Sequence, residues 1–142
     1  MGFLRKIVTA AVSLPLAATA VIAMAPQASA ASGPACGGNC LVFTYNSNIA
    51  GSRTYFWGSD VPDLASYTFL TSGAGQGQAL KNNAAAALND SPDPSTIFFN
   101  SNYGGSCDTL GWYTIADQLH NTYNNNASFR LGYSNSKCYQ FN

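Results

Sequence analysis

The stretch IFFNSNYGGS, residues 97–106, decides the fold of this chain. A related stretch, FTYNSNIAGS, lies 54 residues earlier at residues 43–52, and five of the ten aligned positions are identical. In each copy an aromatic and β-branched run leads into Asn-Ser-Asn and then a glycine, which predicts a β-hairpin. The repeat therefore indicates two copies of one unit, each burying its apolar face against the other.

Residues 1–30 have the pattern of a secretory signal peptide. Arg5 and Lys6 form a basic start, a long apolar run follows, and Ala-Ser-Ala at residues 28–30 suits a cleavage site. We expect cleavage after this site and a secreted, extracellular protein without membrane attachment.

The 112 residues that follow, 31–142, are expected to form one domain. They contain four Lys or Arg, six Asp and no Glu, which gives a net charge of −2. No basic patch is available to neutralise phosphates, so we expect no nucleic-acid partner. We expect a monomer.

No stretch of the chain has a catalytic signature. His120 is the only histidine, no Gly-x-Ser-x-Gly motif is present, and a carboxylate pair would have to come from two Asp. We therefore expect no enzymatic activity.

Four cysteines, an even number in a small exported domain, favour disulfides. They are Cys36, Cys40, Cys107 and Cys138, and they allow three pairings. We favour Cys36–Cys40 and Cys107–Cys138. A zinc site is the alternative, but the spacing is not Cys-x2-Cys and His120 is the only available imidazole.

A cluster of turn-forming residues, NDSPDPS at 89–95, predicts a linker between units at about residues 36–88 and 96–142. We expect residues 80–88 to form a closing strand or a short turn, and residues 67–70 a third strand or a packed loop. The Gly-rich residues 73–77 fall in an insertion of about 12 residues and predict a flexible surface loop. Strands are predicted at residues 41–45, 53–57, 96–99, 129–133 and 138–141.

Phe98, Tyr103 and Gly105 form the pattern aromatic-x4-aromatic-x-Gly. This pattern resembles the signature of the βγ-crystallin Greek key, in which the hairpin folds over and an aromatic corner packs on the glycine. The first copy keeps Gly51 but neither aromatic residue. The resemblance implies an all-β, βγ-crystallin-like sandwich of two Greek-key units in tandem, after the signal peptide. Stacking two hairpin-centred halves gives the same sandwich.

The chain also resembles a secreted bacterial metalloproteinase-inhibitor family of small two-disulfide domains. The resemblance rests on CGGNCLVFTYNSN at residues 36–48, KNNA at 81–84 and FNSNYGG at 99–105. It implies a proteinaceous peptidase inhibitor whose partner is an extracellular peptidase held by a rigid, substrate-like loop. No motif identifies that loop, and the candidates are residues 73–78, 89–95 and 134–137.

Calcium is the one metal that the crystallin resemblance suggests; otherwise no cofactor is expected. The family's pattern, Asn/Asp-Asn/Asp-x-x-Ser/Thr-Ser, is kept in part at Asn124, Asn125 and Ser128. In the first half, alanines replace both hydroxyl residues. The alternative is that these asparagines cap turns.

Trp57 and Trp112 are the last residues of the return strands predicted for the two hairpins. We favour packing in the core, and the alternative is an exposed aromatic platform for sugar or protein. Exposure of these rings would favour a second function in place of peptidase inhibition. This function is that of a crystallin-like extracellular module that binds glycans or cell surfaces and could act against microbes. A structural stress protein without inhibitory activity is a third.

Overall fold

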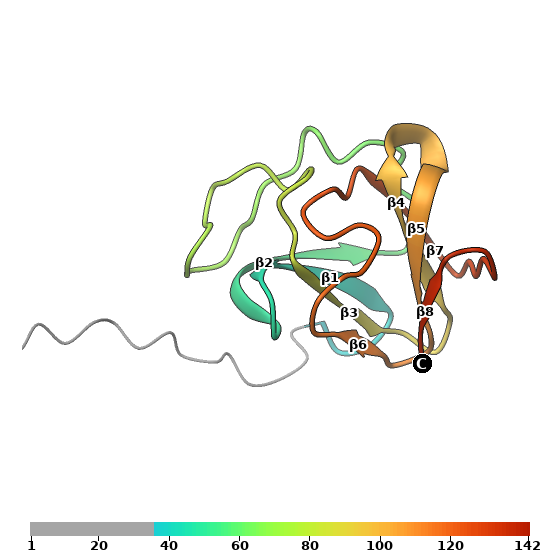
Figure 1. The fold of residues 1–142 in the computed structure, drawn as a ribbon. Helices are drawn as coiled ribbons and strands as arrows, with labels where there is room; N and C mark the ends of the chain where they lie inside the picture. The colour runs from blue at the N-terminus through green and yellow to red at the C-terminus, as the bar shows by residue number, and fades with distance from the viewer. Residues whose placement is uncertain (1–35) are drawn as a thin grey trace, which may run out of the picture.

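The computed structural model describes residues 36–142, so the signal peptide predicted at residues 1–30 lies outside the described residues. The described chain forms two four-stranded sheets, in the orders β2-β1-β3-β6 and β7-β4-β5-β8 (Figure 1). The elements are β1 (Cys40–Asn46), β2 (Ala50–Trp57), β3 (Ala86–Asp90), β4 (Ser95–Asn100), the short 3-10 turn η1 (Ser101–Tyr103), β5 (Gly104–Leu110), β6 (Ile115–Ala116), β7 (Ser128–Leu131) and β8 (Tyr139–Phe141). Over residues 36–142, no helix is long and apolar enough to cross a membrane.

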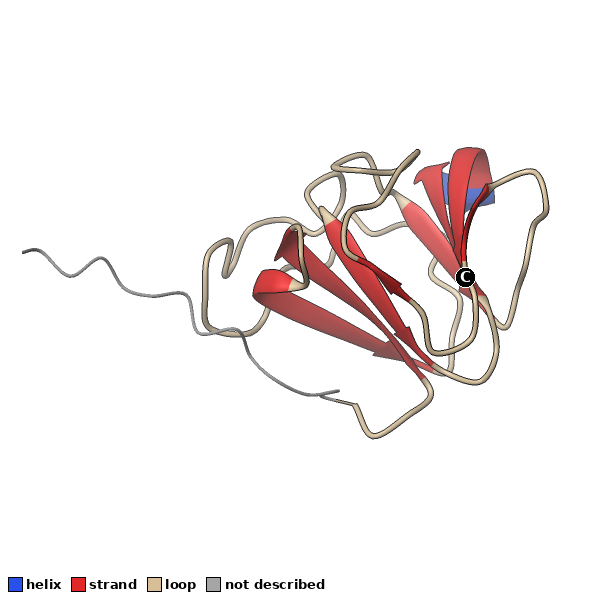
Figure 2. Ribbon diagram, turned by 60° about the horizontal axis from the view of Figure 1, so that its bottom comes forward, coloured by secondary structure: helices blue, strands red, loops and turns tan. Residues whose placement is uncertain are grey.

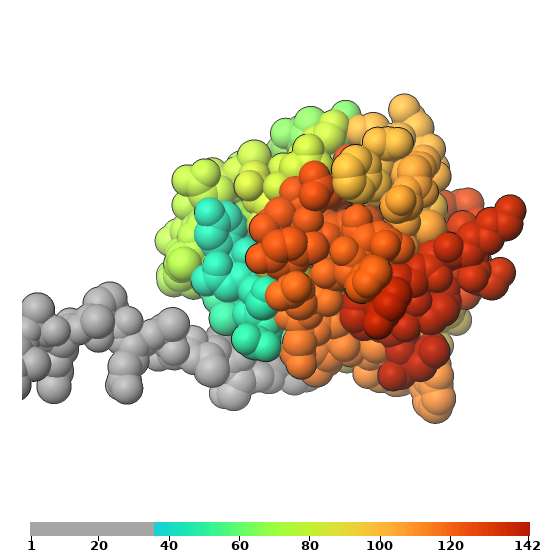
Figure 3. Space-filling view, in the orientation of Figure 1, coloured from blue at the N-terminus to red at the C-terminus, as the bar shows by residue number. Residues whose placement is uncertain are grey.

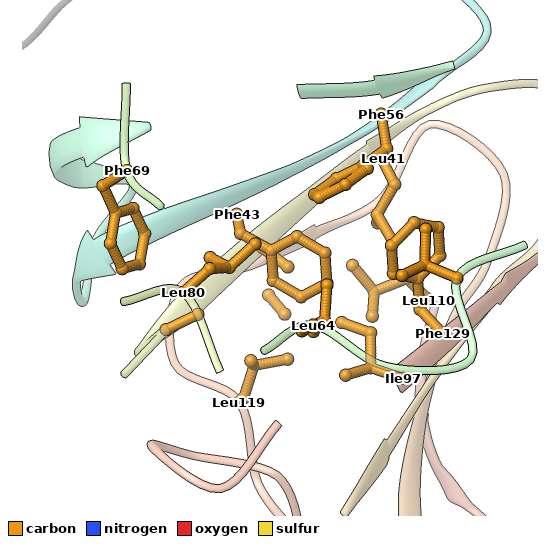
Figure 4. Close-up of a cluster of buried hydrophobic side chains, with 14 residues drawn as sticks. Leu41, Phe43, Phe56, Leu64, Phe69, Leu80, Ile97, Leu110, Leu119 and Phe129 are labelled. Atoms are coloured by element: carbon orange, nitrogen blue, oxygen red, sulfur yellow. The ribbon is translucent and has the colours of Figure 1, made fainter. Parts of the chain in front are cut away.

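The two sheets form the layers of a sandwich with one main core between them (Figure 2). Leu41 and Phe43 on β1 both point inward, because successive residues of a strand face opposite sides of the sheet. From the other sheet, the ring of Phe129 lies 5.7 Å from that of Phe43 and 4.7 Å from that of Phe56 (Figure 4). The predicted all-β, two-sheet architecture is confirmed.

Each half of the chain forms backbone hydrogen bonds with the sheet of the other half. The second half supplies β6, which pairs with β3 of the first half through Leu88 and Ile115. In return, Val61 of the first half pairs with Phe129 of β7, and each residue donates its N–H to the carbonyl of the other at 3.0 Å. The first sheet therefore includes one strand of the second half, and the second sheet carries a single bridge from the first half.

The loops that precede β3 and β7 also form backbone hydrogen bonds with each other across the two halves. Asn82 N–H donates to the carbonyl of Asn126 at 2.8 Å, and Asn124 N–H donates to the carbonyl of Ala84 at 3.0 Å. Asn82 and Asn124 are equivalent positions, and both adopt positive φ, which asparagine tolerates better than most residues. The buried Asn126 side chain accepts from Ala84 N–H at 3.2 Å and donates to the carbonyls of Ala84 and Thr122 at 2.7 and 3.0 Å. This side chain therefore ties the two halves together.

A glycine in the left-handed region closes each repeated hairpin. Gly51 has φ of 77° and Gly105 has φ of 80°. A Cβ on Gly105 would lie 2.8 Å from the side-chain nitrogen of Asn100, so this turn requires glycine. In the second hairpin the rings of Phe98 and Tyr103 pack edge to face with centroids 5.9 Å apart, as expected for the aromatic corner.

In each hairpin a side-chain hydroxyl donates to a backbone carbonyl of the turn, but the two hydroxyls come from non-equivalent positions of the repeat. In the second half, Ser128 donates its hydroxyl to the carbonyl of Asn100 at 2.7 Å. The equivalent of Ser128 in the first half is Ala86, which has no hydroxyl. There Thr44 donates to the carbonyl of Asn46 at 2.8 Å, so the equivalent carbonyl is still satisfied.

Both favoured disulfides are formed. Cys36–Cys40 closes the entry to β1, and Cys107–Cys138 links β5 to the segment that leads into β8. β8 pairs in parallel with β5, so the disulfide and the strand pairing fix the C-terminal segment together. All four cysteines are used in this way, and the alternative zinc site is wrong.

The connection between the two units is shorter than predicted at residues 89–95. Asn89 and Asp90 complete β3, and Ser95 begins β4, which leaves residues 91–94 as the connection. The prediction was too wide because Asn89, a turn-former by type, is buried and accepts from the hydroxyl of Ser95 at 3.1 Å. The closing strand expected within residues 80–88 is confirmed as β3.

Residues 66–80 form a packed loop, which was one of the two outcomes expected for residues 67–70. Thr68 makes a single bridge to Ala79, while Phe69 and Leu80 are buried. The Gly-rich part also packs on the first hairpin, since Ser52 N–H donates to the carbonyl of Ala74 at 2.9 Å. The prediction of a flexible surface loop did not anticipate this contact.

Replacing Asn126 tests the contact between the halves. We expect Asn126→Ala to lower the free energy of unfolding by about 2 kcal/mol, because the buried N–H of Ala84 loses its side-chain acceptor and the carbonyls of Ala84 and Thr122 each lose one of their two donors. Asn125→Ala is the matched control, since Asn125 is exposed and its side chain donates only to the carbonyl of Tyr123. We expect a loss below about 0.5 kcal/mol. Urea unfolding measures both, and equal losses would contradict the assignment.

Candidate functional site

Trp57 and Trp112 are exposed, with 56% and 73% of their surfaces accessible. The favoured prediction, packing in the core, is wrong for both. Phe56 occupies the inward position at this end of β2, so the next residue, Trp57, faces outward. β5 ends at Leu110, so Trp112 falls in the turn beyond the strand.

The two tryptophans lie along one edge of the molecule. Trp57 is opposite the first residue of β1, which in turn is opposite Asp90 at the end of β3. Immediately after β3, the carbonyl of Ser91 accepts from the N–H of Tyr113, the neighbour of Trp112, at 3.0 Å. Three strand spacings, about 14 Å, therefore separate the backbones of Trp57 and Tyr113. We call Trp57, Trp112 and residues 91–94 the tryptophan end.

A hollow of about 220 Å³ opens between the sheets at the tryptophan end. It borders Gly58, the residue after Trp57, and the connection at residues 91–94. Tyr55 extends the aromatic surface, since its ring centroid lies 5.9 Å from that of Trp57. The hollow is lined by Asn39, Cys40, Gly58, Ser91, Asp93, Leu131 and Gly132.

The connection at residues 91–94 is exposed but held in place. Pro92 and Asp93 are exposed at its tip. The buried Asn89 side chain donates to the carbonyl of Asp93 at 2.8 Å, and Tyr133 N–H donates to the carbonyl of Pro94 at 3.0 Å. The loop is thus fixed from both sheets.

A larger hollow, of about 420 Å³, lies at the opposite end of the β1–β2 hairpin. We call it the amide hollow, because asparagines predominate among its lining residues, which are 45–47, Asn83, Ala85, Tyr123 and Asn124. Its walls come from both halves of the chain. In Figure 3 the blue-green tip of the first hairpin lies against the orange loop of the second half, where Asn48 N–H donates to the carbonyl of Asp117 at 2.7 Å.

Comparison with known proteins identifies the fold. No protein-family model matches the sequence, and no curated protein matches it significantly. Among solved structures, one from work on the evolution of the eye lens βγ-crystallin domain fold superimposes with a TM-score of 0.57 at 16% identity, covering 70% of this chain and 89% of that chain. This chain has the βγ-crystallin fold. A βγ-crystallin from an archaeon is similar at a TM-score of 0.49 and 17% identity, covering 66% of this chain and 98% of that chain.

The βγ-crystallin part of the predicted resemblance is therefore confirmed as a fold. The narrower resemblance to metalloproteinase inhibitors finds no support in these comparisons and stays a prediction.

Within the βγ-crystallin fold, the three calcium candidates do not share one hollow. Asn124 lines the amide hollow, whereas Asn125 and Ser128 do not. Ser128 is buried, donates its hydroxyl to Asn100 and accepts from Tyr103 N–H at 3.0 Å. Calcium binding stays a prediction, and its support is now limited to Asn124.

The sulfur atoms of Cys36 and Cys40 and the carboxylate of Asp90 lie within 4.8 Å of one another. This group resembles a metal site in composition only. Both sulfurs belong to one disulfide and carry no thiolate, which is the form of cysteine that binds metals. Asp90 instead accepts from Gly38 N–H at 3.1 Å and fixes the disulfide loop.

The ring of His120 stacks on Tyr139 with centroids 4.1 Å apart, and its Nδ1 lies 3.0 Å from the amide oxygen of Asn121. Over residues 36–142, no serine or cysteine side chain is hydrogen-bonded to this ring. The imidazole thus lies at the surface, stacked on a tyrosine. That the protein has no enzymatic activity stays a prediction.

Sequence reasoning missed Asp108, which is fully buried in β5. Its carboxylate accepts from the N–H groups of His120, Asn121 and Thr122 at 3.1, 2.9 and 2.9 Å, and from the Thr122 hydroxyl at 2.6 Å. Asp108 thereby shapes the loop that leads to the amide hollow. An acidic residue inside a strand next to Cys107 was the available signal.

Asp63 and Lys81 give a test of the surface electrostatics. The Lys81 ammonium lies 2.9 Å from the Asp63 carboxylate, and this bond, together with that from Ala65 N–H, holds the pKa of Asp63 below its usual 3.8. Because the pKa of Asp63 is lower in the folded than in the unfolded state, ionised Asp63 stabilises the fold at pH values above its unfolded-state pKa. This contribution is lost as the pH falls through the folded-state pKa. We expect Lys81→Met to raise the pKa of Asp63, measured by NMR titration of its carboxyl carbon. An unchanged midpoint would contradict the pairing.

Proposed function

We propose that this protein is an extracellular, non-catalytic binding module that holds extended glycans at the tryptophan end. The observation that carries the proposal is the exposure of Trp57 and Trp112 on one edge of a rigid sandwich. Large exposed aromatic rings that are not covered by the fold are typical of binding surfaces.

The chemistry of this edge suits a neutral polysaccharide. Tryptophan rings offer flat apolar faces to the C–H faces of sugar rings, and their indole N–H groups remain available as donors. A spacing of about 14 Å across the strands lets separate sugar rings of one chain meet the two aromatic positions. Because Trp57 is anchored in β2 and the connection is fixed by Asn89, little conformational entropy is lost on binding.

Retention on insoluble glycans tests the proposal. We expect the mature protein to be retained on at least one of chitin, cellulose and peptidoglycan. Trp57→Ala and Trp112→Ala should each weaken retention about tenfold or more, which corresponds to ~1.4 kcal/mol. Phe99→Ala is the matched control, since Phe99 is an exposed aromatic residue on β4, outside the tryptophan end.

Failure of all three glycans to retain the protein counts against the proposal. Equal losses in Phe99→Ala and the two tryptophan variants would also contradict it, because the aromatic positions would then have no special role.

A second candidate function is inhibition of an extracellular metalloproteinase, as the family resemblance implies. The observation that favours it is the connection at residues 91–94, which is exposed at Pro92 and Asp93 and fixed from both sheets. A loop that is already held in one conformation loses less conformational entropy when it enters a protease cleft. Of the other candidates, residues 73–78 pack on the first hairpin, and residues 134–137 lead into a tight turn in which Cys138 N–H donates to the carbonyl of Asn135 at 3.0 Å.

Inhibition of a thermolysin-like protease by the purified mature protein tests this candidate. We expect Asp93→Ala to weaken the inhibition about tenfold, ~1.4 kcal/mol, and Lys137→Ala, in the turn before Cys138, to leave it unchanged. No inhibition at a large molar excess would eliminate the inhibitor function.

A further inference from the structure

We propose that the amide hollow is a second binding site, which takes one neutral, hydroxyl-rich ring: a single pyranose residue. Its volume of about 420 Å³ falls within the range of roughly 300–1,000 Å³ that is usual for small-molecule sites. The inference does not depend on the tryptophan end. The two sites lie at opposite ends of β1, about 20 Å apart along the strand.

The hollow gathers hydrogen-bonding groups that the protein does not use. The side-chain amides of Asn46 and Asn124 and the hydroxyls of Tyr45 and Tyr123 are not hydrogen-bonded to any part of the chain that the structure describes, and all four residues line the hollow. The amide of Asn83 donates to the carbonyls of residues 79 and 81, and this leaves its oxygen as an acceptor. Amides and phenols both donate and accept, which matches the mixed role of sugar hydroxyls.

Two tyrosine rings supply the apolar part of the site. Tyr45 is held in place, because its ring packs edge to face on Phe69 with centroids 5.4 Å apart and rests on Gly75. A Cβ at Gly75 would lie 2.1 Å from the Tyr45 ring, so the close approach requires glycine. Tyr123 enters from the other half of the chain and is 39% exposed. A fixed ring and an accessible ring thus border the same space.

The lining carries no charged side chain. An anionic ligand such as a phosphate would find no cation among the lining residues, and a cationic ligand would find no carboxylate. The chemistry therefore selects a neutral ligand.

The pseudo-symmetry of the fold shows that this hollow is not a necessary feature of the repeat. The reciprocal bonds make Asn82 the counterpart of Asn124, and hence Lys81 the counterpart of Tyr123. At that second position Lys81 reaches the hydroxyl of Ser101 at 2.9 Å and the carboxylate of Asp63 at 2.9 Å. The protein's own side chain thus bridges the space there, whereas at Tyr123 the equivalent position is open.

An NMR titration tests the site. The probes are methyl glucoside, methyl galactoside, methyl mannoside and N-acetylglucosamine, each added to the ¹⁵N-labelled mature protein. We expect at least one of them to shift the amides of Asn83, Tyr123 and Asn124 saturably, with a Kd of about 1 mM, as the size of one sugar ring implies.

Variants separate the hollow from the fold and from the tryptophan end. We expect Asn124→Gly to weaken the sugar response about tenfold, because glycine keeps the positive φ and removes the amide. Asn82→Gly is the matched control at the pseudo-equivalent position, and it should leave the response unchanged, as should Trp57→Ala. Tyr123→Phe removes only the hydroxyl and should weaken the response several-fold.

Three results would overturn the proposal. One is the absence of a saturable response to any of the four sugars. Another is an equal loss of response in Asn124→Gly and Asn82→Gly. The third is a response of these amides to calcium alone, which would assign the hollow to a cation. Glycan retention that is lost in Trp57→Ala while the sugar response persists would show that the two sites are independent.

Discussion

The fold depends on one constraint: the backbone of each half completes its hydrogen bonds on the other half. The strand β6 of the second half pairs with β3 of the first, and Val61 of the first half forms a β-bridge to Phe129 of the second. The loops repeat the exchange through Asn82 and Asn124. Each of these hydrogen bonds contributes about 0.5–1.5 kcal/mol to stability, and separating the halves would lose all of them and expose the shared core to water. We therefore expect the two halves to unfold together, as one cooperative domain.

This arrangement also determines where binding can occur. The core lies between the two sheets, and the two ends of the β1–β2 hairpin carry the exposed features. At one end are Trp57 and the fixed connection; at the other, the amide hollow between the halves. Both features sit on backbone that packing and hydrogen bonds hold in place. The proposed binding sites thus need no rearrangement of the fold.

The sequence predicted the features that depend on local pattern. The repeat at residues 97–106, the hairpin glycines and the closing strand are read from neighbouring residues. The disulfide pairing that forms is the favoured one of the three that four cysteines allow. The exposure of Trp57 was missed because it depends on Phe56 taking the inward position, which only the sheet register decides. Asn126 and Asp108 were missed because partners 12 to 42 residues away in the sequence are brought near only by the folded chain. The amide hollow could not be foreseen for the same reason.

The most direct test of the central claim is native-state hydrogen exchange at the middle of the two central strands. If the halves unfold together, the amides of Val42 on β1 and Ile97 on β4 exchange through openings of the same free energy, equal to that of global unfolding. We also expect Asn126→Ala to lower both by the same amount. Different opening free energies for the two strands, or a loss confined to one half, would show that the halves unfold separately and would contradict the account.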